Sequence, residues 1–339
     1  MRYVVIGAGS IGGAIAARLA QQRRDRVVLA ARGRRADLIE HVGLRLRTPD
    51  EDVVIGVDVV RSPADVRLRA DDVLVMATKT QQVEGALREW VDVPVHEGDD
   101  QVGTAGERLP VLLALNGVAA EQIAHRYFDR VVGVCVWLPA VSLEPGEVFV
   151  RIAPRSGVLI LGEVPPGGRA DGLLDGVAAD LERAGFEIHV VEDVLRWKYR
   201  KLLTNLGNAV QALVGPDAEG AGAVSARLRQ EGAAVLAHAG IECASADEED
   251  AWRRDLFVDR VVPGEPAQMG GSTWQSLARG ADSNEADFLN GEIVAIARAH
   301  GGEAPLNARV QALARQASSS GARPASLTVP ELERALDAR

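Results

Sequence analysis

The sequence predicts an α/β protein with a doubly wound, mostly parallel sheet followed by an all-helical C-terminal domain. Over the first 191 residues, short apolar runs of the length of buried strands alternate with helical patterns. After Val191 the strand signals stop, and helical periodicity continues to about Gln316. We therefore expect an α/β domain over residues 1–191, a helical domain over residues 192–317, and a tail over residues 318–339 that is only partly ordered.

Length and composition agree with a globular protein of two domains. The chain has 339 residues, of which 47% are hydrophobic and 25% charged. The net charge of −10 and the lack of a dense basic patch argue against a nucleic-acid partner. No apolar run is long enough to span a bilayer, and Met1 leads directly into the first expected strand without a signal peptide. We expect a cytoplasmic protein with no membrane partner, and a homodimer is the candidate assembly.

A metal centre is not expected. Cys135 and Cys243 are the two cysteines, and the six histidines are scattered without a recognisable ligand spacing. Buried apolar thiols are the simplest interpretation of both cysteines.

A glycine motif follows the first expected strand, Arg2–Ile6, without a spacer. In a strand–turn–helix of this kind the first glycine permits the tight turn, the second lets the backbone approach a pyrophosphate, and the third lets the helix pack on the strand. The helix N-terminus adds free N–H groups and a partial positive charge. A structural turn is the alternative, but the position of the motif favours a Rossmann-type dinucleotide site. Its cofactor-binding candidates are Gly7, Gly9, Ser10, Ile11 and Gly12.

Arginines follow the second expected strand, Arg26–Ala31, where an acidic residue would hold the adenosine ribose of NAD. Here the chain reads Arg32-Gly33-Arg34-Arg35. Guanidinium groups bind a 2′-phosphate through charge-assisted hydrogen bonds, whereas a carboxylate would repel it. We therefore predict NADPH as the cofactor, with Arg32 as its main contact. A solvated turn is the alternative interpretation.

Two polar residues follow further buried strands. Lys79 comes after Val73–Ala77 and Asn116 comes after Pro110–Leu115. Ligands gather beyond the carboxyl ends of strands in such sheets, so both residues are candidates for cofactor and substrate contacts. A surface lysine and an Asn-Gly turn are the alternatives. Between the two strands, Val93–Arg108 is polar and glycine-containing, and we expect an irregular surface insertion there.

A polar stripe marks the first long helix of the second domain. Lys201, Thr204, Asn205 and Asn208 are spaced to share one face of that helix. Solvated faces are usually rich in Glu, Lys and Arg, whereas this stripe is amide and hydroxyl around one lysine. That composition favours a half-buried site for a small polar ligand over a solvated face.

Two later residues have ready structural explanations. Glu285 is expected to open a helix over Asn284–His300, where Asp282 and Glu285 have the spacing of a capping pair. Ser272 has the position of a helix N-cap.

Taken together, these residues resemble the ketopantoate reductase (2-dehydropantoate 2-reductase) family over most of the chain. The family's motifs occur in order. They are Gly7-Ala8-Gly9-Ser10-Ile11-Gly12, Arg32, Lys79-Thr80-Gln81-Gln82, Asn116-Gly117, Arg200-Lys201-Leu202-Leu203-Thr204-Asn205, Ser272-Thr273-Trp274-Gln275 and Glu285-Ala286-Asp287-Phe288-Leu289-Asn290-Gly291. The resemblance implies a Rossmann domain, a helical domain, and reduction of a small 2-oxo acid by NADPH.

The resemblance also implies roles. Lys201 would be the general acid that protonates the carbonyl oxygen, and Glu285 would orient this lysine and the substrate hydroxyl. The resemblance would place the active site in the cleft between the two domains. The substrate-binding candidates are Lys79, Asn116, Asn205, Asn208 and Ser272.

The sequence departs from the family pattern on the substrate side. Ala209 stands where a second asparagine is usual, Asn208 comes one residue earlier, and one extra residue lies between Gln275 and Glu285. Two alternatives to 2-dehydropantoate reduction therefore stay open. One is the same chemistry on a different 2-oxo acid or ketone in a specialised pathway. The other is a non-catalytic NADP(H)-binding sensor, against which the retention of Lys201 and Glu285 argues.

Overall fold

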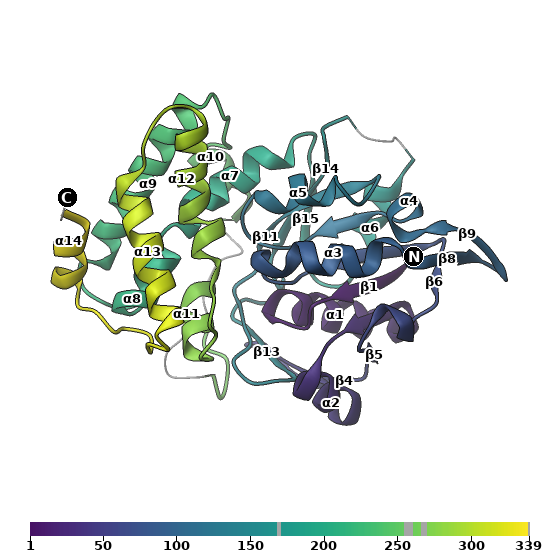
Figure 1. The fold of residues 1–339 in the computed structure, drawn as a ribbon. Coiled ribbons are helices and arrows are strands. Elements are labelled where there is room, and N and C mark those ends of the chain that lie inside the picture. The colour runs from purple at the N-terminus through teal and green to yellow at the C-terminus, as the bar shows by residue number, and fades with distance from the viewer. Residues whose placement is uncertain (168–170, 254–259, 266–269, 338–339) are drawn as a thin grey trace. The chain divides into compact units, whose positions relative to one another are not determined.

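The computed structural model describes residues 1–167, 171–253, 260–265 and 270–337 (Figure 1). The chain forms two compact units. The first unit comprises Met1–Asn116, Ala120–Trp197 and Ser245–Glu265, and the second comprises Gly117–Ala119, Lys198–Ala244 and Pro266–Arg339. This division differs from the boundary expected at Val191, because a segment far along the chain returns to the first unit.

An eight-stranded sheet forms the centre of the first unit, in the order β15-β14-β11-β10-β7-β1-β2-β5. Only the β11–β14 pair is antiparallel, and the other six pairs are parallel. The prediction of a doubly wound, mostly parallel sheet is therefore confirmed. The strands are β1 (Arg2–Ile6), β2 (Val27–Ala30), β5 (Asp58–Val60), β7 (Asp72–Met76), β10 (Val111–Leu113), β11 (Val131–Trp137), β14 (Val158–Val164) and β15 (Glu187–Val190).

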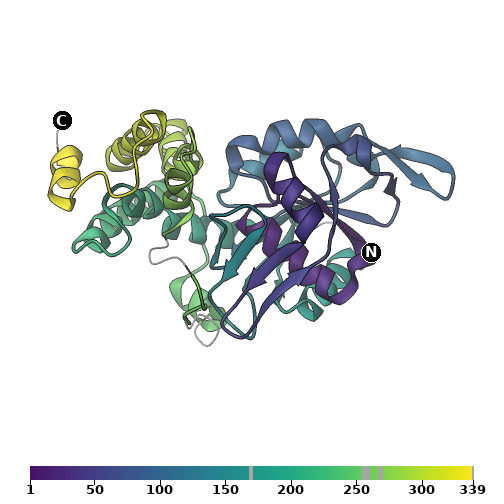
Figure 2. The same cartoon turned by 90° about the horizontal axis from the view of Figure 1, so that it is seen from below.

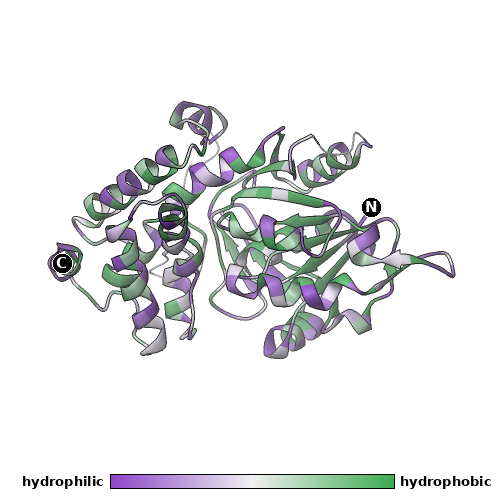
Figure 3. Cartoon of the chain, turned by 45° about the horizontal axis from the view of Figure 1, so that its top comes forward, coloured by the Kyte–Doolittle hydropathy of each residue, from purple (hydrophilic) through white to green (hydrophobic). Residues whose placement is uncertain are grey.

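Both faces of this sheet are buried, which explains the continuous apolar runs of its strands. Alternate residues of β1 enter different cores: Tyr3 and Val5 join one, whereas Val4 and Ile6 join the other. Figure 3 shows the resulting hydrophobic strands between helices of mixed character. The first core includes residues of α1 (Ser10–Arg23), α2 (Gly33–Val42) and α6 (Leu173–Arg183), and the second includes residues of α3 (Val83–Val91), α4 (Ala105–Arg108) and α5 (Ala119–Ala124).

The expectation of an irregular insertion over Val93–Arg108 is wrong. This stretch forms β8 (Pro94–Glu97), β9 (Asp100–Thr104) and α4, and β8 also pairs with β6 (Leu68–Arg69). The hairpin extends from the rest of the first unit (Figures 1 and 2). Its base is ordered because Val95 and Leu109 are buried in the core that contains the helix α3.

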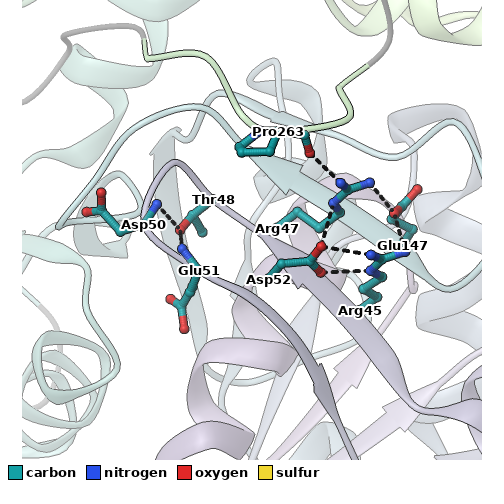
Figure 4. A network of polar contacts seen from close by, with 8 residues as sticks. All are labelled: Arg45, Arg47, Thr48, Asp50, Glu51, Asp52, Glu147 and Pro263. Atoms are coloured by element: carbon teal, nitrogen blue, oxygen red, sulfur yellow. Dashed lines mark hydrogen bonds and ion pairs between the residues drawn. The ribbon is translucent and has the colours of Figure 1, made fainter.

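A four-stranded sheet, in the order β12-β13-β3-β4, lies next to α1 and carries a polar network on its surface (Figure 4). Arg45 forms two hydrogen bonds with Asp52, at 2.8 and 2.7 Å. Arg47 contacts Glu147 at 3.2 Å and donates to the carbonyl oxygen of Pro263. This contact attaches the returning segment to the first unit. The strands are β12 (Ala140–Val141), β13 (Glu147–Val150), β3 (Leu44–Arg47) and β4 (Asp52–Ile55).

The helix α10 (Ala246–Arg253) is the other part of this segment. Trp252 stacks on both His189 and Trp197, each with a ring-centroid separation of 4.0 Å. The guanidinium of Arg253 lies 3.8 Å from the ring centre of Trp137. Aromatic stacking and a cation–π contact therefore hold α10 on the first unit.

The described part of the second unit contains helices, turns and connecting segments but no strand. Its helices are the C-terminal part of α7 (Val194–Asn205), α8 (Asn208–Val214), α9 (Ala221–His238), α11 (Ser272–Ala278), α12 (Asn290–Ala299), α13 (Pro305–Ser319) and α14 (Val329–Asp337). None of the helices in the described part of the chain has the length and apolar character needed to cross a membrane.

The tail contains regular structure in the part that is described. The backbone N–H groups of Ala325 and Leu327 donate to carbonyls of α8 at 2.9 Å each, and α14 buries Leu332 and Leu336. The expectation of a partly ordered tail did not include these contacts.

Candidate active site

The three motif glycines face different surroundings. A Cβ on Gly7, whose φ is +110°, would lie 2.7 Å from the carbonyl oxygen of Ala77. A Cβ on Gly12 would lie 1.9 Å from the carbonyl oxygen of Gly7. A Cβ on Gly9 would meet nothing within 4 Å. Packing within the chain therefore requires glycine at positions 7 and 12, whereas Gly9 borders open space of the kind a pyrophosphate needs.

The N-terminus of α1 is also suited to an anion. Gly9 is its N-cap and supplies no side-chain cap, and the first turn contains no acidic residue. The first backbone N–H groups, at Ser10 and Ile11, come from half-buried residues. The nearby Thr78 hydroxyl is buried and has no hydrogen-bond partner among the described residues. These features fit a dinucleotide phosphate at the N-terminus of this 14-residue helix.

The three arginines after β2 take different positions. Arg35 points back to the glycine loop, where it donates to the carbonyl oxygen of Ala8 and to the hydroxyl of Ser142, both at 2.9 Å. Arg34 is exposed. Arg32 is the N-cap residue of α2 and forms an ion pair with Glu89 of α3. The geometry thus leaves Arg32 and Arg34 toward solvent at the end of β2.

Lys79 and Asn116 lie at the carboxyl ends of the neighbouring parallel strands β7 and β10. Both residues are half-buried. Thr80, which begins the 3₁₀ turn η3 (Thr80–Gln82), donates from its hydroxyl to the carbonyl oxygen of Asn116 at 3.1 Å. The structure therefore brings the Lys79 and Asn116 segments together beyond the carboxyl ends of these two strands.

The polar stripe of the second unit does not lie on one continuous helix, as the sequence analysis expected. The helix α7 ends at Asn205, and α8 begins at Asn208 after a turn at Leu206-Gly207. Lys201 is half-buried and Asn205 is buried, whereas Thr204 is exposed. The turn separates Asn208 from the helix that carries Lys201.

Asn208 and Ser272, both expected to bind substrate, are in contact. The amide nitrogen of Asn208 lies 3.4 Å from the hydroxyl of Ser272. A Cβ on Gly271 would lie only 2.7 Å from the amide oxygen of Asn208, so glycine permits this approach. Gln211, which the sequence analysis did not select, accepts from the backbone N–H of Gly271 at 3.1 Å. These contacts join the start of α8 to the start of α11.

Glu285 is 2% exposed and begins a short 3₁₀ turn, η4 (Glu285–Phe288), which precedes α12. The prediction of one helix over Asn284–His300 is therefore wrong at its start. The N-cap is Asn284, whose side chain accepts from the backbone N–H of Ala286 at 2.8 Å. The N-cap of this turn is therefore Asn284 and not Asp282.

Arg279 and Gly117 interact with Glu285 or with its turn. Arg279 belongs to the longer connection before Glu285, and Gly117 belongs to the Asn-Gly motif. Burial lowers the pKa of Arg279 from its ordinary value, and the negative charge of Glu285 opposes this shift. The carboxylate of Glu285 is thus within electrostatic range of the Arg279 guanidinium. Gly117 has a φ of +79°, and a Cβ on it would lie 2.9 Å from the carbonyl oxygen of Phe288. Close approach to η4 therefore explains the glycine of the Asn-Gly motif.

Comparison with known proteins shows the family. A family model described as "Ketopantoate reductase PanE/ApbA" matches residues 3–166, and one described as "Ketopantoate reductase PanE/ApbA C terminal" matches residues 193–318. The chain belongs to the ketopantoate reductase family. It is therefore an oxidoreductase that acts on the CH–OH group of its donor.

Relatives match this ketopantoate reductase family member along nearly its whole length. A 2-dehydropantoate 2-reductase from Caulobacter vibrioides is 31% identical, with 93% of this chain and 98% of the relative covered. One from Pyrococcus horikoshii is 25% identical, with 95% and 99% covered. A ketopantoate reductase structure from Ralstonia eutropha JMP134 has a TM-score of 0.74 at 26% identity, covering 95% of this chain and 99% of that one. A D-mandelate dehydrogenase solved with NADH shares the fold, with a TM-score of 0.76, 20% identity, and coverage of 95% and 99%.

The last two residues of the family's Glu-x-Asp-x-x-Asn-Gly motif have structural positions. The buried Asn290 donates to the carbonyl oxygen of Leu206 at 3.2 Å and to the side chain of Asn307 at 2.9 Å. A Cβ on Gly291 would lie 2.6 Å from the amide nitrogen of Gln311. The motif therefore fixes the turn between α7 and α8 as well as supplying Glu285. The described residues contain no group of three or more His, Cys, Asp or Glu that could hold a metal ion.

Proposed function

We propose that the chain reduces a small 2-oxo acid to the 2-hydroxy acid with NADPH, with 2-dehydropantoate as the substrate in pantothenate and coenzyme A biosynthesis. The observation that carries this proposal is a combination within one chain. An open dinucleotide cradle at Gly9 occurs together with Lys201 and the buried Glu285, and full-length relatives are named 2-dehydropantoate 2-reductase. A sensor without turnover would need neither a general acid nor its partner.

When bound, NADPH supplies the hydride that reduces the carbonyl carbon. The ammonium group of Lys201 donates a proton to the carbonyl oxygen and stabilises the negative charge that develops there. The carboxylate of Glu285 orients Lys201 and accepts from a substrate hydroxyl. One hydride and one proton together convert the ketone into the alcohol.

The other polar residues position the two reactants. Asn205, Asn208 and Ser272 bind the hydroxyl and carboxylate of the substrate through their amide and hydroxyl groups. Lys79 and Asn116 contact nicotinamide and substrate. On the cofactor side, the N-terminus of α1 binds the pyrophosphate and Arg32 binds the 2′-phosphate.

The test is the oxidation of NADPH, followed by absorbance, with a panel of 2-oxo acids that includes 2-dehydropantoate, pyruvate and 2-oxoisovalerate. Selective turnover of 2-dehydropantoate supports the proposal in full. Faster turnover of another acid would retain the chemistry and change the substrate. Tight NADPH binding without turnover of any 2-oxo acid or ketone would contradict the reductase proposal and favour the sensor.

A different 2-oxo acid or ketone is the second candidate, because one observation favours it. Ala209 stands where the family commonly has a second asparagine, and the amide of Asn208 is engaged with Ser272. The donors available to a substrate at this position therefore differ from the family pattern. The same panel separates the two candidates through the ratio of their kcat/KM values.

A further inference from the structure

Arg32, the residue proposed to bind the 2′-phosphate, has an anionic partner within the first unit. Its guanidinium pairs with the carboxylate of Glu89, which lies 57 residues further along the chain on α3. Both side chains are accessible, with exposed fractions of 68% for Arg32 and 41% for Glu89. The carboxylate thus occupies the position beside Arg32 that an anionic ligand would take.

The surroundings of Arg32 are otherwise suited to an anion. It precedes α2, a helix of ten residues whose N-terminus has no side-chain cap and no acidic residue in its first turn. A Cβ on Gly33 would meet nothing within 4 Å, so the backbone here borders open space. The basic residue Arg34 is also exposed. Glu89 is the acidic group that the structure pairs with Arg32 at this otherwise positive site.

An exposed ion pair of this kind is weak, because water screens the two charges and the pairing restricts two flexible side chains. A 2′-phosphate carries a charge of about −1.5 to −2 at neutral pH and offers three acceptor oxygens, so it can displace a single carboxylate. The displaced carboxylate must still be released from Arg32, and that release reduces the affinity gained from the phosphate. NADH has a ribose hydroxyl in place of the phosphate and does not need Arg32 in this way.

We propose that Glu89 is a specificity-determining residue for the cofactor: it competes with the 2′-phosphate for Arg32 and thereby narrows the preference for NADPH over NADH. This inference rests on the proposed binding of NADPH through Arg32. The preference of the natural chain for NADPH over NADH should therefore be smaller than that of a chain that has Arg32 but lacks the carboxylate of Glu89.

The test compares nucleotide binding by the full-length wild type and Glu89→Gln, using titrations of NADPH and NADH at low ionic strength and at about 0.5 M salt. Glu89→Gln should tighten NADPH binding about two- to fivefold and leave the Kd of NADH nearly unchanged. The gain should shrink at high salt, where exposed charges are screened. The gain in NADPH affinity should also be lost in an Arg32→Ala background, because Glu89 then has no ion pair with Arg32 to compete with the phosphate.

Glu84→Gln is the matched control, because it removes the same charge from the same helix. Glu84 pairs with Arg88 and Tyr127 instead of Arg32, so this variant should not change the NADPH/NADH ratio. Three results would overturn the inference: an unchanged or weakened NADPH affinity in Glu89→Gln, an equal gain for both nucleotides, or an equal gain without Arg32. A separate result, in which Arg32→Ala leaves wild-type NADPH affinity intact, would instead contradict the proposed cofactor site.

Discussion

Gly9 and Gly12 belong to one motif, yet the structure gives their missing side chains different consequences. Gly12 is closed in by the backbone of Gly7, whereas Gly9 borders open space. Gly9 also has a φ of −79°, which alanine adopts without strain. The motif predicts that Gly9 lets the backbone approach a pyrophosphate and that Gly12 lets the helix pack on the strand, and the different surroundings of the two glycines agree with that division.

We expect Gly9→Ala and Gly12→Ala to separate stability from binding. Gly9→Ala should change the free energy of unfolding by less than about 1 kcal/mol, while weakening NADPH binding at least about tenfold. Gly12→Ala should destabilise the first unit by about 3 kcal/mol or more, because its methyl group would overlap a carbonyl oxygen. Urea denaturation and nucleotide titration of both variants provide the measurements. Normal NADPH affinity in Gly9→Ala would remove the case for a phosphate at this glycine.

Substitutions of Lys201 distinguish two proposed effects: stabilisation of the developing negative charge by its positive charge, and donation of a proton. Lys201→Ala should lower kcat by about 10²–10⁴-fold and leave the Kd of NADPH unchanged, because the residues of the proposed nucleotide site belong to the first unit. Lys201→Arg keeps the positive charge but cannot donate a proton, since a guanidinium has a pKa above about 12. If proton donation dominates, the arginine variant will be as slow as the alanine variant in single-turnover kinetics. Substantial recovery by arginine would show that Lys201 acts through its charge.

Single residues could be predicted from the sequence where their motif has a local spacing. The positions of the glycine loop between β1 and α1, and of Lys201 and Asn205 on one helix, are of this kind, whereas their roles stay predictions. The partner of Arg32 could not be predicted, because Glu89 lies 57 residues away and nothing local marks an exposed ion pair. The same holds for the Asn208–Ser272 contact, which depends on Gly271 to let the two segments approach.

Helix α10 shows that the sequence of a helix does not reveal the structural unit to which it belongs. Its helical sequence, within a long run of helices, indicates a helical domain. Its position is set by Trp252 and Arg253, which contact His189, Trp197 and Trp137 of the first unit. Sequence periodicity reports that a helix forms, but the surface on which it packs depends on contacts between residues far apart.

The contact of His189 with this helix should make stability depend on pH. Burial lowers the pKa of His189 below its ordinary value, and Glu187 and Glu182 oppose the shift. The unfolded chain therefore binds a proton at a higher pH than the folded chain does. The free energy of unfolding should fall as the pH drops from about 6.5 through the lowered pKa, and this contribution is complete above about pH 7.5.

His189→Phe tests this dependence, because phenylalanine keeps a flat ring against Trp252 and does not titrate. Urea denaturation between about pH 5 and pH 8 should show a flatter pH profile for this variant than for the wild type. His125→Phe, at an exposed histidine, is the control and should leave the profile unchanged. Identical profiles for wild type and His189→Phe would mean that His189 does not couple protonation to folding.

Two other elements differ from the prediction, for different reasons. The β8–β9 hairpin reads as a loop because its burial depends on little more than Val95 and the following Leu109. The break between α7 and α8 interrupts a helical pattern that continues through it. There the carbonyl oxygen of Leu206 is satisfied by Asn290, a partner 84 residues away. Local propensity favoured a continuous helix, and tertiary hydrogen bonding decided otherwise.

The molecule as a whole combines an α/β unit and a helical unit, and the residues of each belong to separate stretches of chain. The order of strands and helices predicts the fold of the first unit well, because buried parallel strands are continuous apolar runs. The second unit was predictable only as helical. Its internal arrangement depends on buried polar contacts, such as those of Asn307 with the carbonyl oxygen of Leu228 and with Glu231, that have no periodic signal.

The tail allows the two units to be perturbed separately. Residues after Ser320 bury Leu332 and Leu336 within the second unit and pair with the backbone of α8, whose first residue is Asn208. Removal of residues 321–339 should destabilise the second unit by about 3–5 kcal/mol through the loss of these two side chains. The glycine loop and Arg32 belong to the first unit, so NADPH affinity should be retained while turnover is lost or becomes heat-labile.

Thermal unfolding with and without NADPH measures both effects. At about 100 times its Kd, NADPH should stabilise the first unit by about 2.7 kcal/mol in the truncated chain as in the full chain. Leu332→Ala and Leu336→Ala keep the chain length and should reproduce the loss of stability in part, about 2–3 kcal/mol each, whereas Arg334→Ala on the exposed side of α14 should not. Trp274 reports on the second unit because the other four tryptophans, at positions 90, 137, 197 and 252, lie in the first. A truncated chain with unchanged Tm and full turnover would show that α14 contributes nothing to the helical unit.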